Sequence, residues 1–154
     1  LSELMRYQLE SAKKDTVLLK EEMEFIENYL LLEEKRLGER STIEFVISDM
    51  VSGYTIAPML LIPFVENAVK HGAQSTNERS TIDISATMRN GQFQFSVVNS
   101  IPNVTPTLNR EGMGLENVQR RLNLLYPKSH ILRINTTEKR YEVHLSIILH
   151  ISSK

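Results

Sequence analysis

The dipeptide Asn90-Gly91 sets the strongest local constraint on the fold, because it stands between two runs of alternating apolar and polar residues. These runs, 81–88 and 92–98, have the period of half-buried strands. Asparagine and glycine both tolerate the positive φ angles that a tight hairpin turn requires. The sequence therefore predicts two neighbouring antiparallel strands in the middle of the chain.

Helices and further strands surround this hairpin. Residues 1–37 carry apolar side chains at helical spacing, and Asp15-Thr16 provides an N-cap at which a second helix can begin. The other predicted elements are a turn at 38–42, a strand at 42–48, a helix at 63–72, a helix from Leu115 that Pro127 ends, strands at 131–136 and 141–149, and loops at 73–80 and 99–112. These elements do not alternate strictly as strand, helix, strand. We therefore expect an α/β fold, a two-layer α/β sandwich with a mixed sheet.

The totals argue against several classes of function. The 154 residues suit one domain, and the formal charge of -1 gives no global basic field, so we expect no nucleic-acid partner. Cysteine is absent, which excludes disulfides and thiolate chemistry. The longest apolar run, 56–65, contains two prolines and is far shorter than the roughly 20 residues of a membrane helix. The chain begins at Leu1 without a signal-like segment, so we expect it to be a fragment of a longer protein.

The stretch "PFVENAVKHG", 63–72, separates apolar from polar side chains on one predicted helix. On a helical wheel the two groups fill opposite arcs: Phe64, Val65, Ala68 and Val69 against Glu66, Asn67, Lys70 and His71. Glu66 and Lys70 have the i, i+4 spacing of an ordinary surface ion pair, and the helix dipole favours a histidine near the C-terminus. Asn67 fits a purely structural role less well, because asparagine is a poor residue for a helix interior. Its side-chain oxygen is suited to a Mg²⁺ ion that also binds nucleotide phosphates.

A second informative stretch is "EGMGLENVQRRLNLLY", 111–126. Gly112 and Gly114 directly precede a predicted helix, where free N–H groups and the helix dipole can hold phosphate. Taken alone, the pattern is more typical of a simple turn and helix cap, and Arg120 and Arg121 suit solvent-facing positions. The two stretches together favour a phosphate and Mg²⁺ site more strongly than either does alone.

These two motifs, in this order and separated by a hairpin and a loop, resemble the ATP-binding domain of sensor histidine kinases, specifically the autolysis-regulator (LytS-like) group. That domain has the Bergerat ATP-binding fold, which gyrase, the Hsp90 chaperones and the MutL repair proteins share. The segment "FIENYLLLEEKRLGER" looks like the helical lead-in that the group carries before the domain. The resemblance thus covers nearly the whole chain.

The resemblance implies roles for the matching positions of the first motif. Asn67 corresponds to the Mg²⁺ ligand of the family's N box. Glu66 corresponds to its acidic catalytic neighbour, which orients the reacting groups, and Lys70 would face the phosphates. Phosphoryl transfer depends mainly on positioning and on neutralising charge, which such side chains supply.

The second motif corresponds to the family's second glycine box. Gly112 and Gly114 would grip phosphate at the start of the helix from Leu115, and residues 100–111 would be the lid over ATP. The chain contains no Walker A pattern, so ATP binding here implies the Bergerat architecture.

The chain departs from the family pattern at the first glycine box, which usually reads Asp-x-Gly-x-Gly. Here the run is "NSIPN": Asn99 stands at the Asp position, and Ile101 and Asn103 replace the two glycines. Asn99 still offers a carbonyl oxygen to the adenine amino group, without the charge that strengthens such a bond. Pro63 also replaces a polar residue that many histidine kinases carry in the N box.

The resemblance implies the organisation of a longer protein. Residues 1–15 would be the remnant of an upstream helical dimerisation and phosphoacceptor domain, and residues 16–154 the ATP-binding catalytic domain. The kinase would transfer the γ-phosphate of ATP to a histidine that this chain lacks, and then to a response regulator. The full-length protein would be a membrane-anchored homodimer with this domain in the cytoplasm.

Two other interpretations stay open. The altered run at Asn99 favours a degenerate, non-catalytic Bergerat-fold module that serves as a signalling or dimerisation scaffold. A Bergerat ATPase that hydrolyses ATP to drive a conformational cycle is a third possibility, against which the kinase-like lead-in argues.

Overall fold

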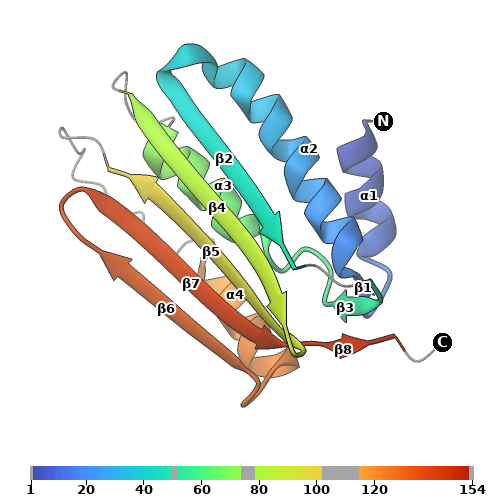
Figure 1. Cartoon of the computed structure of the whole chain (residues 1–154). Coiled ribbons are helices and arrows are strands. Elements are labelled where there is room, and N and C mark those ends of the chain that lie inside the picture. Colours follow the sequence, from blue (N-terminus) through green and yellow to red (C-terminus); the bar gives the residue numbers. More distant parts are fainter. Residues whose placement is uncertain (1, 50–51, 74–78, 102–114, 153–154) are drawn as a thin grey trace.

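A computed structural model describes residues 2–49, 52–73, 79–101 and 115–152. A five-stranded sheet forms one layer, with strand order β2-β4-β5-β7-β6 (Figure 1). The strands are β2 (Ser41–Ser48), β4 (Ser80–Arg89), β5 (Gln92–Ser100), β6 (His130–Thr136) and β7 (Arg140–Ile148). β2 pairs with β4 in parallel, and the other neighbours pair antiparallel, so the sheet is mixed as predicted.

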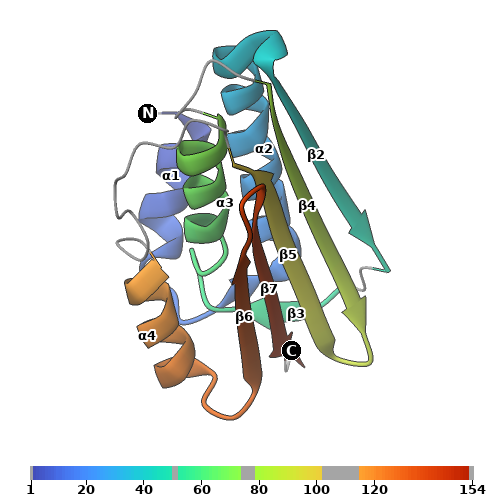
Figure 2. The same cartoon turned by 90° about the vertical axis from the view of Figure 1, so that its left-hand side faces the viewer.

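The helices form the second layer. They are α1 (Glu3–Ser11), α2 (Leu19–Leu37), α3 (Ile62–Ala68) and α4 (Leu115–Leu125). The short helical turn η1 (Gly38–Arg40) follows α2, and η2 (Val69–Ala73) follows α3. Figure 2 shows these α-helices on the same side of the sheet. The predicted two-layer α/β sandwich is therefore confirmed. No helix within the described ranges is long and apolar enough to cross a membrane.

Strand periodicity explains why only one face of the sheet is covered. Alternate residues of β4, such as Ile82 and Ile84, are buried, and so are Phe93 and Phe95 of β5. Their neighbours in sequence are mainly Ser, Thr and Gln and point to the uncovered face. Burying a large apolar side chain stabilises the fold by about 1.5–3 kcal/mol, so the helices pack on the apolar face.

The predicted hairpin is present between β4 and β5. Asn90 has φ 50° and Gly91 has φ 79°, which are the positive values that the dipeptide predicts. The break near Asp15 also separates two helices, as predicted. The N-cap predicted at Asp15-Thr16 is wrong, because β1 intervenes and α2 begins at Leu19 with Leu18 as its N-cap.

Several details differ from the sequence-based expectation. A second, three-stranded sheet of β1 (Val17–Leu18), β3 (Tyr54–Ile56) and β8 (His150–Ile151) was not predicted, because runs of two or three residues carry no measurable period. Ile47, expected on the inner face of β2, is 37% exposed because β2 is an edge strand. The helix at 63–72 starts at Ile62 and ends in a π-helical turn, η2. The predicted loop at 99–112 begins later, since Asn99 and Ser100 belong to β5, and its residues from 102 lie outside the described ranges.

The hairpin turn provides a test of this backbone geometry. Replacement of Gly91 by alanine is expected to lower the free energy of unfolding by about 1–2 kcal/mol, because an L side chain at φ 79° is strained. Urea denaturation at pH 7 measures the change.

Asn90→Gly is the matched control at the neighbouring turn position. Glycine relieves the strain at φ 50°, which stabilises the fold, but it also raises the entropy of the unfolded chain, which destabilises the fold. The free energy of unfolding should therefore change by less than about 1 kcal/mol. Equal losses in the two variants would contradict the assigned turn.

Candidate functional site

The polar side of α3 and η2 is the first part of the candidate site. The apolar residues of this segment, Phe64, Val65, Ala68 and Val69, are buried in the core. Glu66 and Lys70 are exposed, and Asn67 and His71 are half-buried. The helical wheel is thus confirmed. Pro63 lies in the first turn of α3, where its missing N–H is not needed.

Gly72 brings the end of this segment against β5. A Cβ atom at Gly72 would lie 3.0 Å from Asn99 Nδ2 and 3.3 Å from the carbonyl oxygen of Ser100. A Cβ atom at this position would force Asn99 or Ser100 to shift, so glycine suits this approach of η2 to the strand. The close contact places Asn99 at the C-terminal end of the helix that carries Asn67 and Lys70.

Asn99 is the polar residue in which the buried row of β5 ends. It is 1% exposed, and its Nδ2 donates to the carbonyl oxygen of Ser100 at 3.0 Å. Its Oδ1 is buried and accepts no hydrogen bond from the described part of the chain. A buried acceptor without a donor costs about 1–3 kcal/mol, which a ligand N–H at this position would recover. Asn99 can therefore serve as a preformed hydrogen-bond acceptor for a ligand.

The electrostatics of Glu66 involve α2 as well as its own helix. Although the Glu66 side chain is exposed, partial desolvation by the surrounding protein raises the pKa of its carboxyl, the Lys70 ammonium one turn later lowers it, and the Glu33 carboxylate of α2 raises it again. Burial also raises the pKa of Tyr29 on α2, and the carboxylates of Glu33 and Glu66 raise it further. The net effect is a pKa for the Glu66 carboxyl above that of an ordinary glutamate.

The second predicted motif is described only from its helix onward. Leu115 is buried at the start of α4, whereas Gly112 and Gly114 lie outside the described residues, as does most of the expected lid. α3 and α4 contact each other, so the helix that follows the glycines is a neighbour of the one that carries Asn67. Whether the glycines approach Asn67 stays a prediction.

Arg121 does not face solvent, which corrects one reading of the sequence. Its guanidinium donates to the carbonyl oxygens of Pro58 at 3.0 Å and Met59 at 3.3 Å, in the segment that leads into α3. Sequence reasoning missed this contact because the partners are more than 60 residues apart. Arg120, by contrast, is exposed.

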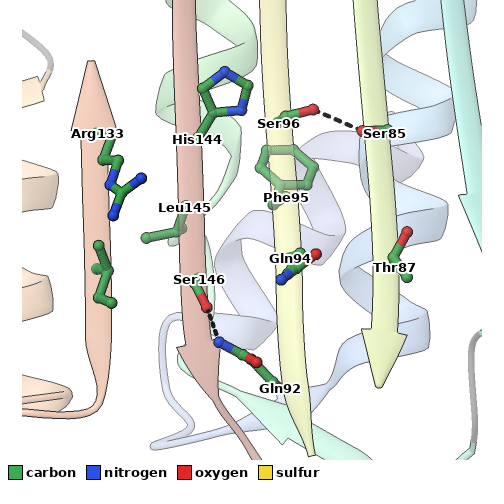
Figure 3. A pocket seen from close by; sticks show the side chains of 11 residues that line it. Ser85, Thr87, Gln92, Gln94, Phe95, Ser96, Arg133, His144, Leu145 and Ser146 are labelled. Carbon is green, nitrogen blue, oxygen red and sulfur yellow. Dashed lines mark hydrogen bonds between the residues drawn. The ribbon is translucent and has the colours of Figure 1, made fainter. Parts of the chain in front are cut away.

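The uncovered face of the sheet carries a different hollow, of about 480 Å³ (Figure 3). Its polar side chains largely satisfy one another: the hydroxyls of Ser85 and Ser96 lie 2.6 Å apart, and Gln92 donates to Ser146 at 2.7 Å. The helices lie behind the strands in this view. This hollow is therefore on the opposite side of the sheet from α3 and is separate from the candidate site.

Comparison with known proteins identifies the family. A family model described as histidine kinase matches residues 1–41. The sensor protein LytS of Staphylococcus haemolyticus is 30% identical over 90% of this chain and 26% of its own length. This chain is homologous to the LytS sensor histidine kinases. The sensor histidine kinase YpdA of Escherichia coli is 28% identical over 87% of this chain and 25% of its own length, so the chain spans about a quarter of these relatives.

Solved structures agree with this homology at the level of the fold. The catalytic domain of the histidine kinase ThkA, in a nucleotide-free form, has a TM-score of 0.62 at 15% identity, over 86% of this chain and 94% of that one. ShkA has a TM-score of 0.60 at 17% identity, over 84% of this chain and 30% of that one. The LytS homologue described here therefore has the fold of histidine kinase catalytic domains.

The raised pKa of Glu66 can be measured directly. An NMR titration of its side-chain carboxyl should give a value above the ordinary 4.5, and Lys70→Met should raise it further because the nearby positive charge is removed. Glu33→Gln should lower it for the opposite reason. Since the folded-state pKa lies above the unfolded-state value, the wild type should lose stability relative to Glu66→Gln as pH rises between the two values.

Glu34→Gln is the control for the Glu33 variant, because Glu34 is the exposed neighbour on α2. It should leave the titration of Glu66 unchanged. An ordinary pKa for Glu66 in the wild type would contradict the described environment of this carboxyl beside Lys70 and Glu33.

Proposed function

We propose that this chain is the ATP-binding catalytic domain of a sensor histidine kinase, which transfers the γ-phosphate of ATP to a histidine on an upstream domain. The observation that carries the proposal is the buried Oδ1 of Asn99, which accepts no hydrogen bond from the described residues and lies beside the end of the α3–η2 segment. Together with homology to LytS sensor histidine kinases, it supports a nucleotide site between these elements. It also favours ligand binding over a non-catalytic scaffold, for which a buried acceptor would be only a cost.

Asn99 would recognise the base. Its Oδ1 would accept a hydrogen bond from the exocyclic amino group of adenine, whereas guanine presents a carbonyl oxygen at the same ring position. The bond from Nδ2 to Ser100 fixes which way the amide faces, so the acceptor and not the donor is turned to the ligand. This arrangement would select adenine nucleotides.

The polar face of α3 would hold the phosphates. Asn67 offers one oxygen ligand to Mg²⁺, an ion that takes six and shares the rest with phosphate and water. Bound Mg²⁺ would supply neutralisation of the phosphate charge. The Lys70 ammonium would add to this neutralisation, Glu66 would accept or hold a proton at its carboxylate near the reacting groups, and Gly112, Gly114 and Leu115 would present backbone N–H groups.

The names of related proteins add support. ShkA, which shares the fold, was solved in complex with AMPPNP, an analogue of ATP. The names of LytS and YpdA describe them as a sensor protein and a sensor histidine kinase. A nucleotide of this class is therefore the ligand that we propose here, with Mg²⁺ as its metal.

The proposal extends to the whole protein. Residues 1–15 would join an upstream phosphoacceptor domain to the catalytic domain of residues 16–154. The full-length protein would be a membrane-anchored homodimer that passes the phosphoryl group to a response regulator, with this domain in the cytoplasm.

Titration with a non-hydrolysable ATP analogue tests the metal and phosphate assignment. Asn67→Ala should weaken binding in the presence of Mg²⁺ at least about tenfold, because the protein's side-chain ligand to the ion is lost. Calorimetry with and without Mg²⁺ measures the effect.

Asn135→Ala, at an exposed position of β6, is the control and should bind like the wild type. No binding by the folded wild-type chain at millimolar nucleotide would refute the proposed function.

Recognition of the base needs a separate variant. Asn99→Leu keeps the shape but removes the acceptor, so affinity for the ATP analogue should fall about 10- to 100-fold, the equivalent of one buried hydrogen bond. Competition between ATP and GTP analogues should show that the preference for adenine is lost as well.

Gly72→Ala should weaken binding too, because its Cβ would push on the Asn99 side chain. Unchanged selectivity in Asn99→Leu would remove Asn99 from the base site even if the nucleotide still binds.

A further inference from the structure

The carboxylate of Glu22 joins three separate parts of the chain. It lies on α2 and is 1% exposed. Its Oε2 accepts a hydrogen bond from the Tyr7 hydroxyl of α1 at 2.5 Å, and its Oε1 accepts one from the backbone N–H of Met59 at 3.0 Å. One buried side chain therefore fixes both α1 and the segment that leads into α3.

The segment that Glu22 holds is strained. Met59 has φ 58°, a left-handed conformation that non-glycine residues rarely adopt and that persists only where the surroundings enforce it. From the other side, Arg121 of α4 donates to the carbonyl oxygens of Pro58 and Met59, and the Tyr126 hydroxyl accepts from the N–H of Ala57 at 2.9 Å. The turn at 57–59 is thus held between α2 and α4.

The position of this turn affects both halves of the candidate site. α3, with Glu66 and Asn67, begins only three residues after Met59, at Ile62. α4, which begins at Leu115 next to the second glycine motif, is tied to the same turn through Arg121. Movement of the turn would therefore change the spacing between α3 and α4.

Among the described residues, hydrogen bonds and the more distant Arg121 charge compensate the charge of Glu22, without a close ion pair. Burial raises the pKa of Glu22, while the hydrogen bonds from Tyr7 and Met59 and the Arg121 charge lower it. A leucine of similar volume would avoid the cost of burying a carboxylate, but it could not hold Tyr7 and Met59 at the same time. The contribution of Glu22 is therefore geometric.

We infer that Glu22 is a positioning residue for the nucleotide site, acting through Met59 and Arg121, and that Tyr7 links the placement of α1 to it. The inference rests on the proposed function. A shift of α1 that withdraws the Tyr7 hydroxyl would release one oxygen of Glu22 and loosen the turn between α3 and α4. Nucleotide affinity would then depend on how α1 is docked.

Calorimetric titration of the 154-residue chain with a Mg²⁺–ATP analogue tests this inference. Glu22→Leu should weaken binding about tenfold or more, because both hydrogen bonds are lost. Glu22→Gln should restore binding to within about threefold of the wild type, since its carbonyl can accept from Met59 and its amide can donate to the Tyr7 oxygen. Tyr7→Phe keeps the ring stack on Phe25 but loses the hydroxyl, so its nucleotide affinity should lie between those of Glu22→Leu and Glu22→Gln.

Two controls separate positioning from stability. Gly91→Ala should be destabilised at the turn between β4 and β5, which makes no contact with Glu22, and Glu24→Gln alters an exposed carboxylate on the same helix. Both should bind like the wild type.

Three results would overturn the inference. If Glu22→Leu binds as well as Gly91→Ala, Glu22 has only a structural role and the inference is overturned. If Glu22→Leu does not fold, wild-type affinity in Tyr7→Phe overturns it instead. If the wild-type chain itself binds no nucleotide, the proposed function fails first and the inference falls with it.

Discussion

Helices cover one face of the five-stranded sheet and polar side chains cover the other, and this asymmetry decides on which side of the sheet the candidate site lies. The inner row of β5 runs through Phe93, Phe95 and Val97 and then reaches Asn99. Strand alternation directs the Asn99 side chain to the same buried face as the three apolar residues before it. The side-chain amide of Asn99 is therefore buried at the edge of the apolar core, at the point where η2 ends against β5.

The parallel pairing of β2 with β4 fixes α3 in its place. Parallel neighbours cannot be joined by a tight turn, so the chain must cross over one face of the sheet between them. The crossover contains β3, α3 and η2, and it returns to β4 at Ser80. The polar face that carries Asn67 is thus part of a connection whose two ends the sheet anchors.

Local patterns predicted much of this arrangement. Asn90-Gly91 predicted the hairpin, and the wheel of residues 63–72 predicted which side of α3 is buried, because both properties depend on residues close in sequence. The edge position of β2 and the π-helical turn could not be predicted, since they depend on strand order and on tertiary packing. The roles of Asn67 and Lys70 were predicted from the family resemblance and stay predictions.

The network around Glu22 was missed for the same physical reason, because Met59 is 37 residues away along the chain. One signal was nevertheless available. Glu22 lies three residues after Leu19 and four before Ile26, on the apolar stripe of α2, where a charged residue requires a partner. A charged residue at helical spacing among buried apolar residues predicts a buried polar contact, although it does not identify the partner residue.

The amide at position 99 has a consequence for the conditions under which the site would operate. A carboxylate in this place would lose its charge and part of its accepting capacity on protonation, whereas a side-chain amide does not titrate. Its orientation is held by the Ser100 carbonyl, to which a carboxylate could not donate. Recognition through this oxygen would therefore not depend on the protonation state of residue 99.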